Sequence, residues 1–376
     1  MDILNVATFV IVTVFVIVLH SHFRVCSCER PQRAQRTQRA QRAQRTQRTQ
    51  RTQRAQRAQR WIRQTSSEKG NVLILSSGGL RQILLLAGAL DTMEFKEVIR
   101  TCDIIEGTSA GALIGLILAA MGPRDEKVNG ALISNMVPNT PCFLSDLCKL
   151  MCNKDVIDFQ LLYDALNTAL IKVQPGVSDY PYEVQIYRTL VIGRIEHLAD
   201  GENNYEEKVI TRGRYSVEDV IRTAVGSASI AGLTSSGSYS DGAQVHPFPI
   251  KEYQHTGRKF VFCPYPYSEM KSPHVDTHLC CFSHIRLLIS SVCYGAIMAH
   301  VYEDIKRIAT NRWQVHDDTG RLYITGVTGV TGVQRDVLVC PQLYIAPNVL
   351  HGASGIEQKA LYDEGVNMGI VLARAM

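Results

Sequence analysis

The chain has 376 residues, of which 45% are hydrophobic and 20% are charged, a composition typical of one large globular domain or two small ones. The formal net charge is +5. The segment Gln32–Arg60 has ten arginines and no acidic residue, so subtracting its charge leaves −5 for the rest of the chain. Such a basic block favours contact with an anionic surface, either a membrane or a nucleic acid. The eleven cysteines are irregularly spaced, which argues against a disulfide framework, and we expect reduced thiols.

The first long apolar run, Ile3–Leu19, has no charge and is rich in Val, Ile, Leu and Phe. As a helix its 17 residues would span about 26 Å, slightly less than a hydrocarbon core of roughly 30 Å. We expect a signal-anchor helix within residues 1–22. A cleaved signal peptide, with a site at Val25-Cys26-Ser27, and a buried soluble element are the alternatives. Basic residues follow the apolar run from Arg24 onward, so the positive-inside rule predicts a single-pass membrane protein whose main domain faces the cytosol.

Residues 23–69 contain a tract, Gln32–Arg60, that repeats Gln-Arg-Ala or Gln-Arg-Thr with a period of three. A helix would crowd ten positive charges together without an apolar stripe, so we predict a disordered, solvated linker. Both an inert triplet expansion and attraction to anionic lipid headgroups fit this tract. A second triplet repeat at Thr325–Val333 favours the first interpretation. No aromatic residue interleaves the arginines of the tract, which argues against nucleic-acid binding.

Strands and helices alternate from residue 70 onward. Apolar runs between turn residues predict strands at Asn71–Ser76, Asp103–Glu106, Thr189–Ile195, Glu207–Ile210 and Phe260–Pro264. Helical patterns lie at Arg81–Met93, Ser109–Met121, Asp158–Leu170, Val217–Val225 and Ile285–Ile308. This alternation predicts a layered α/β fold with a mostly parallel central sheet, which we expect to be a single domain over residues 70–376.

The sharpest motif is Gly107-Thr108-Ser109-Ala110-Gly111, between an expected strand and an expected apolar helix. In this context G-x-S-x-G forms a nucleophile elbow, a strained turn around which only very small residues fit. The turn would expose the serine hydroxyl at a helix N-terminus, where the helix dipole favours developing negative charge. Ser109 is therefore the candidate nucleophile, and the alternative is a tight turn without chemistry.

A second glycine turn, Ser77-Gly78-Gly79-Leu80-Arg81, lies thirty residues upstream and also follows an expected strand. Such a turn presents several free backbone N–H groups, which suit a phosphate or an oxyanion. The chain has neither G-x-G-x-x-G nor a Walker pattern, which argues against a nucleotide site. Together with a nucleophile elbow, an oxyanion hole is the better interpretation, with Arg81 adding positive charge.

A nucleophilic serine needs a base. Tyr239-Ser240-Asp241-Gly242-Ala243 places an acid beside glycine in a turn that follows the small-residue stretch Ser229–Ser236. An Asp-Gly turn taken alone is usually structural.

These motifs, in this order, resemble the patatin-like phospholipase family. Its glycine-rich loop, G-x-S-x-G serine and D-G-[GA] aspartate match Ser77–Gln82, Gly107–Gly111 and Asp241–Ala243, and Ile221–Gly232 is similar to the segment that precedes the aspartate. The resemblance covers Asn71–Pro249 and extends weakly to the C-terminus at Asp363-Glu-Gly.

The resemblance implies a three-layer α/β/α fold and a Ser-Asp dyad that needs no histidine, metal or cofactor. It implies that Ser109 attacks an acyl ester, that Asp241 accepts the serine proton, and that Gly78 and Gly79 hold the oxyanion. Residues Gly242 and Ala243 would form the turn after the base. The chain departs from the family pattern at three places: Ser77, Gln82 and Pro247-Phe248.

A cluster of potential metal ligands also lies within eleven residues: His274, His278, Cys280, Cys281 and His284. It includes no clean C-x-x-C pair. Zinc binding, buried or free thiols and palmitoylation all remain open, and we assign no metal site.

The leading functional hypothesis is therefore an acyl-lipid hydrolase that releases fatty acids from phospholipids or related lipids. A Ser-Asp-His triad esterase is the second hypothesis, because His246, His255 and His274 all follow Asp241. The third is a membrane-tethered lipid-binding protein without catalytic activity, which the presence of both Ser109 and Asp241 disfavours.

Overall fold

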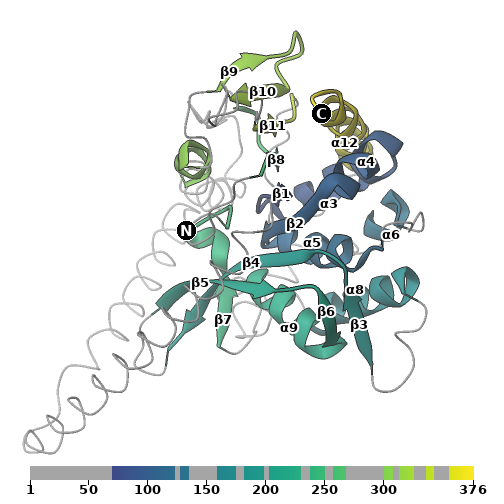
Figure 1. The fold of residues 1–376 in the computed structure, drawn as a ribbon, viewed down its shortest axis with the longest axis vertical. Helices are drawn as coiled ribbons and strands as arrows, with labels where there is room; N and C mark the ends of the chain where they lie inside the picture. The colour runs from purple at the N-terminus through teal and green to yellow at the C-terminus, as the bar shows by residue number, and fades with distance from the viewer. Residues whose placement is uncertain are drawn as a thin grey trace, which may run out of the picture. The chain divides into compact units, whose positions relative to one another are not determined.

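A nine-stranded mixed sheet forms the centre of the part of the chain that the structure describes (Figure 1). The computed structural model describes residues 70–122, 128–134, 159–174, 182–198, 203–229, 238–249, 257–267, 300–307, 313–325, 336–342 and 355–376. All of them belong to one compact unit, Glu68–Met376. The expected membrane anchor, the arginine tract and the cluster at 274–284 lie outside the described residues.

The sheet is parallel at its centre and antiparallel at both edges. Its order is β5-β4-β2-β1-β8-β11-β10-β9, with β7 paired to β4, and the pairs from β4 to β11 along this path are parallel. The strands are β1 (Asn71–Leu75), β2 (Cys102–Thr108), β4 (Thr189–His197), β5 (Asn203–Ile210), β7 (Tyr239–Asp241), β8 (Lys259–Phe262), β9 (Trp313–His316), β10 (Leu322–Thr325) and β11 (Val337–Val339). Two further strands, β3 (Glu183–Ile186) and β6 (Gly213–Ser216), form a separate antiparallel pair.

Helices cover one face of this sheet and share a single apolar core with it. They are α3 (Gly79–Leu90), α4 (Met93–Thr101), α5 (Ala110–Ala120), α6 (Gly130–Ser134), α8 (Phe159–Val173), α9 (Val217–Ser227) and α12 (Gly355–Arg374). Helix α5 is buried along its whole length, because it lies against β2 and β4 and is itself covered by α8 and α9. An apolar helix of this kind is stable only inside such a layer, and its position fixes the turn that precedes it.

The opposite face of the sheet is buried too. Val72, Ile104 and Val191 on that face are at most 1% exposed. Glu106 lies among them, and its burial raises the pKa of its carboxyl well above the usual value, opposed by the positive charge of Lys259. Figure 1 draws the helical segment 300–307 on the other side of the strands from α3, α4 and α12.

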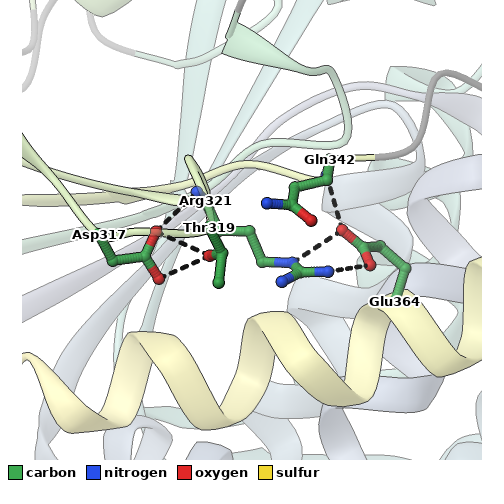
Figure 2. Close-up of polar contacts among 5 residues, drawn as sticks. All are labelled: Asp317, Thr319, Arg321, Gln342 and Glu364. Carbon is green, nitrogen blue, oxygen red and sulfur yellow. Dashed lines mark hydrogen bonds and ion pairs between the residues drawn. The ribbon is translucent and has the colours of Figure 1, made fainter.

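The C-terminal helix is held to the far edge of the sheet by a largely buried ion pair (Figure 2). Arg321, just before β10, donates through Nε and an Nη atom to both carboxylate oxygens of Glu364 on α12, at 3.0 and 2.8 Å. The Gln342 N–H donates to the same carboxylate at 2.6 Å. Asp317 organises the β9–β10 turn by accepting from the backbone N–H of Arg321 and the hydroxyl of Thr319. These bonds lower the pKa of Asp317, although partial burial opposes them.

The expected α/β fold with a mostly parallel sheet is confirmed, and the first strand, the elbow helix and α9 lie where the sequence predicts them. The helix expected at Arg81–Met93 is α3, which ends at Leu90. Helix α4 was not predicted; it begins at Met93 because Thr92 caps it by accepting the Phe95 N–H. Strands β3, β6, β7 and β9–β11 and helix α12 were not predicted. In the described residues no helix is both long and apolar enough to cross a membrane.

Candidate active site

Ser109 lies at the junction of β2 and α5, with a backbone conformation that a residue with a side chain rarely adopts. Its φ is 57° and its ψ is −125°, and it is the one non-glycine residue with positive φ in the described part of the chain. Such a conformation typically costs about 1–3 kcal/mol and persists only where its surroundings enforce it. A strained residue between a strand and a helix is the geometry expected of a nucleophile elbow, and the catalytic role of Ser109 stays a prediction.

The two glycines of the elbow are required by close backbone contacts. A Cβ atom on Gly107 would lie 2.3 Å from the carbonyl oxygen of Gly111, and one on Gly111 would lie 2.4 Å from the carbonyl oxygen of Leu75. Both obstacles are main-chain atoms that cannot rotate away. The elbow therefore packs directly on the end of β1. Thr108 and Ala110, on either side of Ser109, are both buried.

Asp241 lies at the end of β7, and its carboxyl is hydrogen-bonded to the Ser109 side chain. Strand β7 pairs with Arg194–Glu196 of β4 just beyond the stretch of β4 that pairs with β2, which brings the two residues together. Asp241 is 5% exposed. Its burial raises the pKa of the carboxyl from 3.8 to about 6, while hydrogen bonds from Ser109 and from the Ala243 N–H oppose that rise.

The turn after Asp241 is a short 3₁₀ helix, η2 (Gly242–Gln244), which Asp241 caps by accepting the Ala243 N–H at 2.8 Å. A carboxylate that accepts one backbone N–H and one hydroxyl has a fixed orientation. A carboxyl with a pKa near 6 is mainly ionised at neutral pH and is still a useful base, because its pKa is close to the working pH.

The glycine loop before α3 lies at the same edge of the sheet as the elbow, since both follow the carboxyl ends of neighbouring parallel strands. Gly78 caps α3, and Gly79 begins it with a positive φ of 53°. The first N–H groups of a helix have no acceptor within that helix, so Gly79 and Leu80 present donors at this edge.

The other residues of the loop are placed differently. The Ser77 N–H donates to the carbonyl of Pro247 at 2.9 Å, so this amide is used inside the protein. Arg81 is buried, with its guanidinium carbon 6.0 Å from the ring centre of Tyr265. Gln82 is fully buried, and within the described structure its side-chain amide has no hydrogen-bond partner.

The model of the patatin-like phospholipase family matches residues 73–253. This range includes the last three residues of β1, the glycine loop, the elbow and the turn after Asp241. The chain carries a patatin-like domain. No curated protein matches the chain.

One of the three triad candidates, His246, lies beside the turn that follows Asp241, but its side chain is bonded elsewhere. His246 Nδ1 lies 3.0 Å from the Oδ1 atom of Asp304, in the segment 300–307. The ring of Tyr205 packs edge-on against it at 4.8 Å between centres. The other two candidates, His255 and His274, lie outside the described residues. Among the described residues no group of three or more His, Cys, Asp or Glu side chains could hold a metal ion.

Two residues of the patatin-like domain that the sequence analysis did not single out bind the backbone of Ser109 and of Asp241. The Ser227 hydroxyl accepts the Ser109 N–H at 2.9 Å, and the Ser229 carbonyl accepts the Asp241 N–H at 2.7 Å. Both lie in the stretch Ile221–Gly232 that resembles the family, but the resemblance assigned them no role. No local pattern marks a serine at a helix end as a partner of a residue more than a hundred positions away.

Proposed function

We propose that the protein is a lipid acyl hydrolase of the phospholipase A or lipase type, a serine carboxylic ester hydrolase working through a Ser-Asp dyad. The patatin-like match supports lipid hydrolysis in general. The observation that carries the finer proposal is the strained Ser109 hydrogen-bonded to the buried Asp241.

In the proposed reaction the Ser109 Oγ attacks the ester carbonyl carbon as its proton passes to the Asp241 carboxylate. Backbone N–H groups of Gly78 and Gly79 stabilise the resulting oxyanion. The tetrahedral intermediate then collapses, the leaving alcohol takes the proton from Asp241, and an acyl-serine remains. Water, deprotonated by the same carboxylate, attacks the acyl-serine and releases the fatty acid, which returns the serine to its starting state.

The direct test compares wild type, Ser109→Ala and Asp241→Asn on phospholipid and on a short-chain ester. We expect Ser109→Ala to lose hydrolysis and labelling by a fluorophosphonate, because the nucleophile is absent. We expect Asp241→Asn to lose at least about 10²-fold in kcat, the low end for removal of a general base. Near-wild-type turnover by Ser109→Ala would refute the proposal.

Two further outcomes identify the alternative functions. An inactive His255→Ala or His274→Ala, together with an inactive Asp241→Asn, would indicate a Ser-Asp-His triad instead of a dyad. His246→Ala should retain the dyad chemistry, because His246 is bonded to Asp304 and not to Asp241. A wild-type chain that binds vesicles but neither hydrolyses lipid nor reacts with the fluorophosphonate would be a lipid-binding protein.

We also propose that the segment before the domain holds the enzyme at its substrate. The apolar run Ile3–Leu19 would anchor the chain as a single span, with the catalytic domain on the cytosolic side. The ten arginines of Gln32–Arg60 would add attraction to anionic headgroups, worth up to about 1 kcal/mol each near the surface. A linker of 29 residues reaches roughly 30 Å as a coil, enough for the domain to meet the same membrane.

This part has its own test. Replacing the ten arginines by glutamine in the full chain should slow hydrolysis of anionic vesicles, and raised salt should slow the unaltered protein in the same way. Hydrolysis of a soluble short-chain ester should not change in either case, because the chemistry is unaltered. Equal vesicle activity of both forms at low salt would contradict the electrostatic role of the tract.

A further inference from the structure

The C-terminal end of α9 binds the backbone of both proposed dyad residues. Ser227, the last residue of the helix, accepts the Ser109 N–H on its hydroxyl. Two residues later the Ser229 carbonyl accepts the Asp241 N–H. One short segment therefore fixes two residues that follow or end different strands, β2 and β7, and that must lie within hydrogen-bond distance of each other to react.

The Ser227 hydroxyl also reaches the sheet. It donates to the carbonyl oxygen of Gly193 on β4 at 2.6 Å. The same carbonyl leaves no room for a side chain at position 242, where a Cβ atom on Gly242 would lie 2.5 Å from it. A single buried hydroxyl thus connects the elbow to the strand on which the turn after Asp241 rests.

Serine suits this position for a physical reason. A hydroxyl can accept one hydrogen bond and donate another at once, and here it does both toward main-chain groups in a site with no solvent exposure. Ser109 precedes the first residue of α5, so its N–H has no acceptor within that helix and donates to a side chain instead. An alanine at position 227 would leave a buried donor and a buried acceptor without this partner.

We propose that Ser227 is a positioning residue for the nucleophile: its hydroxyl holds the strained backbone of Ser109 against β4 and sets the alignment of the serine with Asp241. Ser227 does not touch the substrate. The inference rests on the proposed function, because it assigns Ser227 a part in the Ser109–Asp241 chemistry.

The test measures kcat, KM, the rate of fluorophosphonate labelling and the Tm of Ser227→Ala in the full chain. A displacement of a reacting group by about 1 Å can lower a rate by about 10²-fold, and we expect kcat to fall by about 10- to 100-fold. We expect KM to change by less than about twofold, because the contact is not made with substrate. Labelling should slow in parallel with kcat.

Thr92→Ala is the matched control. The Thr92 hydroxyl has the same bonding pattern as that of Ser227, donating to the Ala89 carbonyl at 2.6 Å and accepting the Phe95 N–H at 3.2 Å, and it is also buried. It lies beyond the far end of α3, which at 12 residues is about 18 Å long. Thr92→Ala should lower the Tm to a similar extent but leave kcat unchanged.

Ser227→Thr separates position from stability. It restores the hydroxyl but adds a methyl group to a fully packed site, which destabilises the fold. If Ser227 acts through its hydrogen bonds, the threonine variant is more active than the alanine variant even where its Tm is lower. A purely structural role predicts that activity follows the Tm.

The outcomes also separate this inference from the proposed function. An active wild type with an equally active Ser227→Ala, or variants whose activities simply follow their Tm, would overturn the role of Ser227 alone. A wild type that neither hydrolyses an ester nor reacts with the fluorophosphonate would overturn the proposed function, and the role of Ser227 with it.

Discussion

The proposed base, Asp241, should make both activity and stability depend on pH, in opposite directions. Burial raises the pKa of its carboxyl to about 6, and the side chain is 5% exposed. The proposed mechanism needs the ionised form. A group with a pKa near 6 is about 90% ionised at pH 7 and about 10% ionised at pH 5, so kcat/KM should fall about tenfold across that interval.

The same burial destabilises the folded state whenever Asp241 is charged. The folded pKa of about 6 lies above the ordinary 3.8, so the folded state binds the proton more tightly than the unfolded state does. Stability from this group is therefore fully present below pH 3.8 and is lost as the pH rises to about 6. At 1.36 kcal/mol per pKa unit, the ionised carboxylate disfavours folding by about 3 kcal/mol at pH 7.

Asp241→Asn removes the charge but keeps the shape and an oxygen that can accept the Ala243 N–H. We expect this variant to be inactive and yet more stable than wild type at pH 7, by up to about 3 kcal/mol, with the gain vanishing near pH 3.5. Urea unfolding between pH 3.5 and 8 measures the stability, and initial rates on a soluble ester between pH 5 and 8 measure kcat/KM.

Two results would refute this reasoning. A kcat/KM that is flat between pH 5 and 8 would mean that no carboxyl with a pKa near 6 controls the reaction. Equal stability of Asp241→Asn and wild type at every pH would mean that the Asp241 carboxylate carries no burial penalty.

Three more predictions concern close packing and buried polar side chains. Gly111→Ala should lower activity and also lower folding stability by about 1–3 kcal/mol, because its Cβ would press on a backbone carbonyl. Gly122→Ala should be tolerated, because its Cβ would meet only ordinary contacts. Urea unfolding and ester hydrolysis test the pair. Glu364→Gln should lower folding stability in a thermal melt by about 3 kcal/mol, because it leaves Arg321 without its buried carboxylate. Asp363→Asn changes an exposed pair with Lys359 and should lower stability by less than about 1 kcal/mol. Gln82→Met should leave folding stability in urea unfolding unchanged or raise it by about 1 kcal/mol, since the buried amide that it replaces has no hydrogen-bond partner within the described structure. A loss of stability above about 2 kcal/mol would show that the amide is bonded.

Local patterns predicted the parts of the site whose geometry depends on residues close to one another in the sequence. The elbow could be found because positions 107 and 111 must be glycine for the turn to pack on β1, and these two glycines are part of the motif itself. The buried strand Asn71–Leu75 and the apolar helix α5 were equally visible, since each has an unbroken apolar run. Helix α12 was missed because glycine interrupts its buried apolar side: Gly365, between Leu361 and Met368, packs on the backbone of Leu85.

The sequence by itself determined the α/β class, from the alternation of apolar strands and helices, and the candidate serine, from a motif with strict steric needs. The candidate acid came from the resemblance to a known family. Tertiary structure alone decided how they work together. The pairing of β7 with β4 brings Asp241 to Ser109, and burial at that junction moves its pKa to about 6. The Ser227 hydroxyl meets the Ser109 amide across 118 positions of the chain. Desolvation and hydrogen bonds between distant residues depend on the packed arrangement, and no local pattern encodes them.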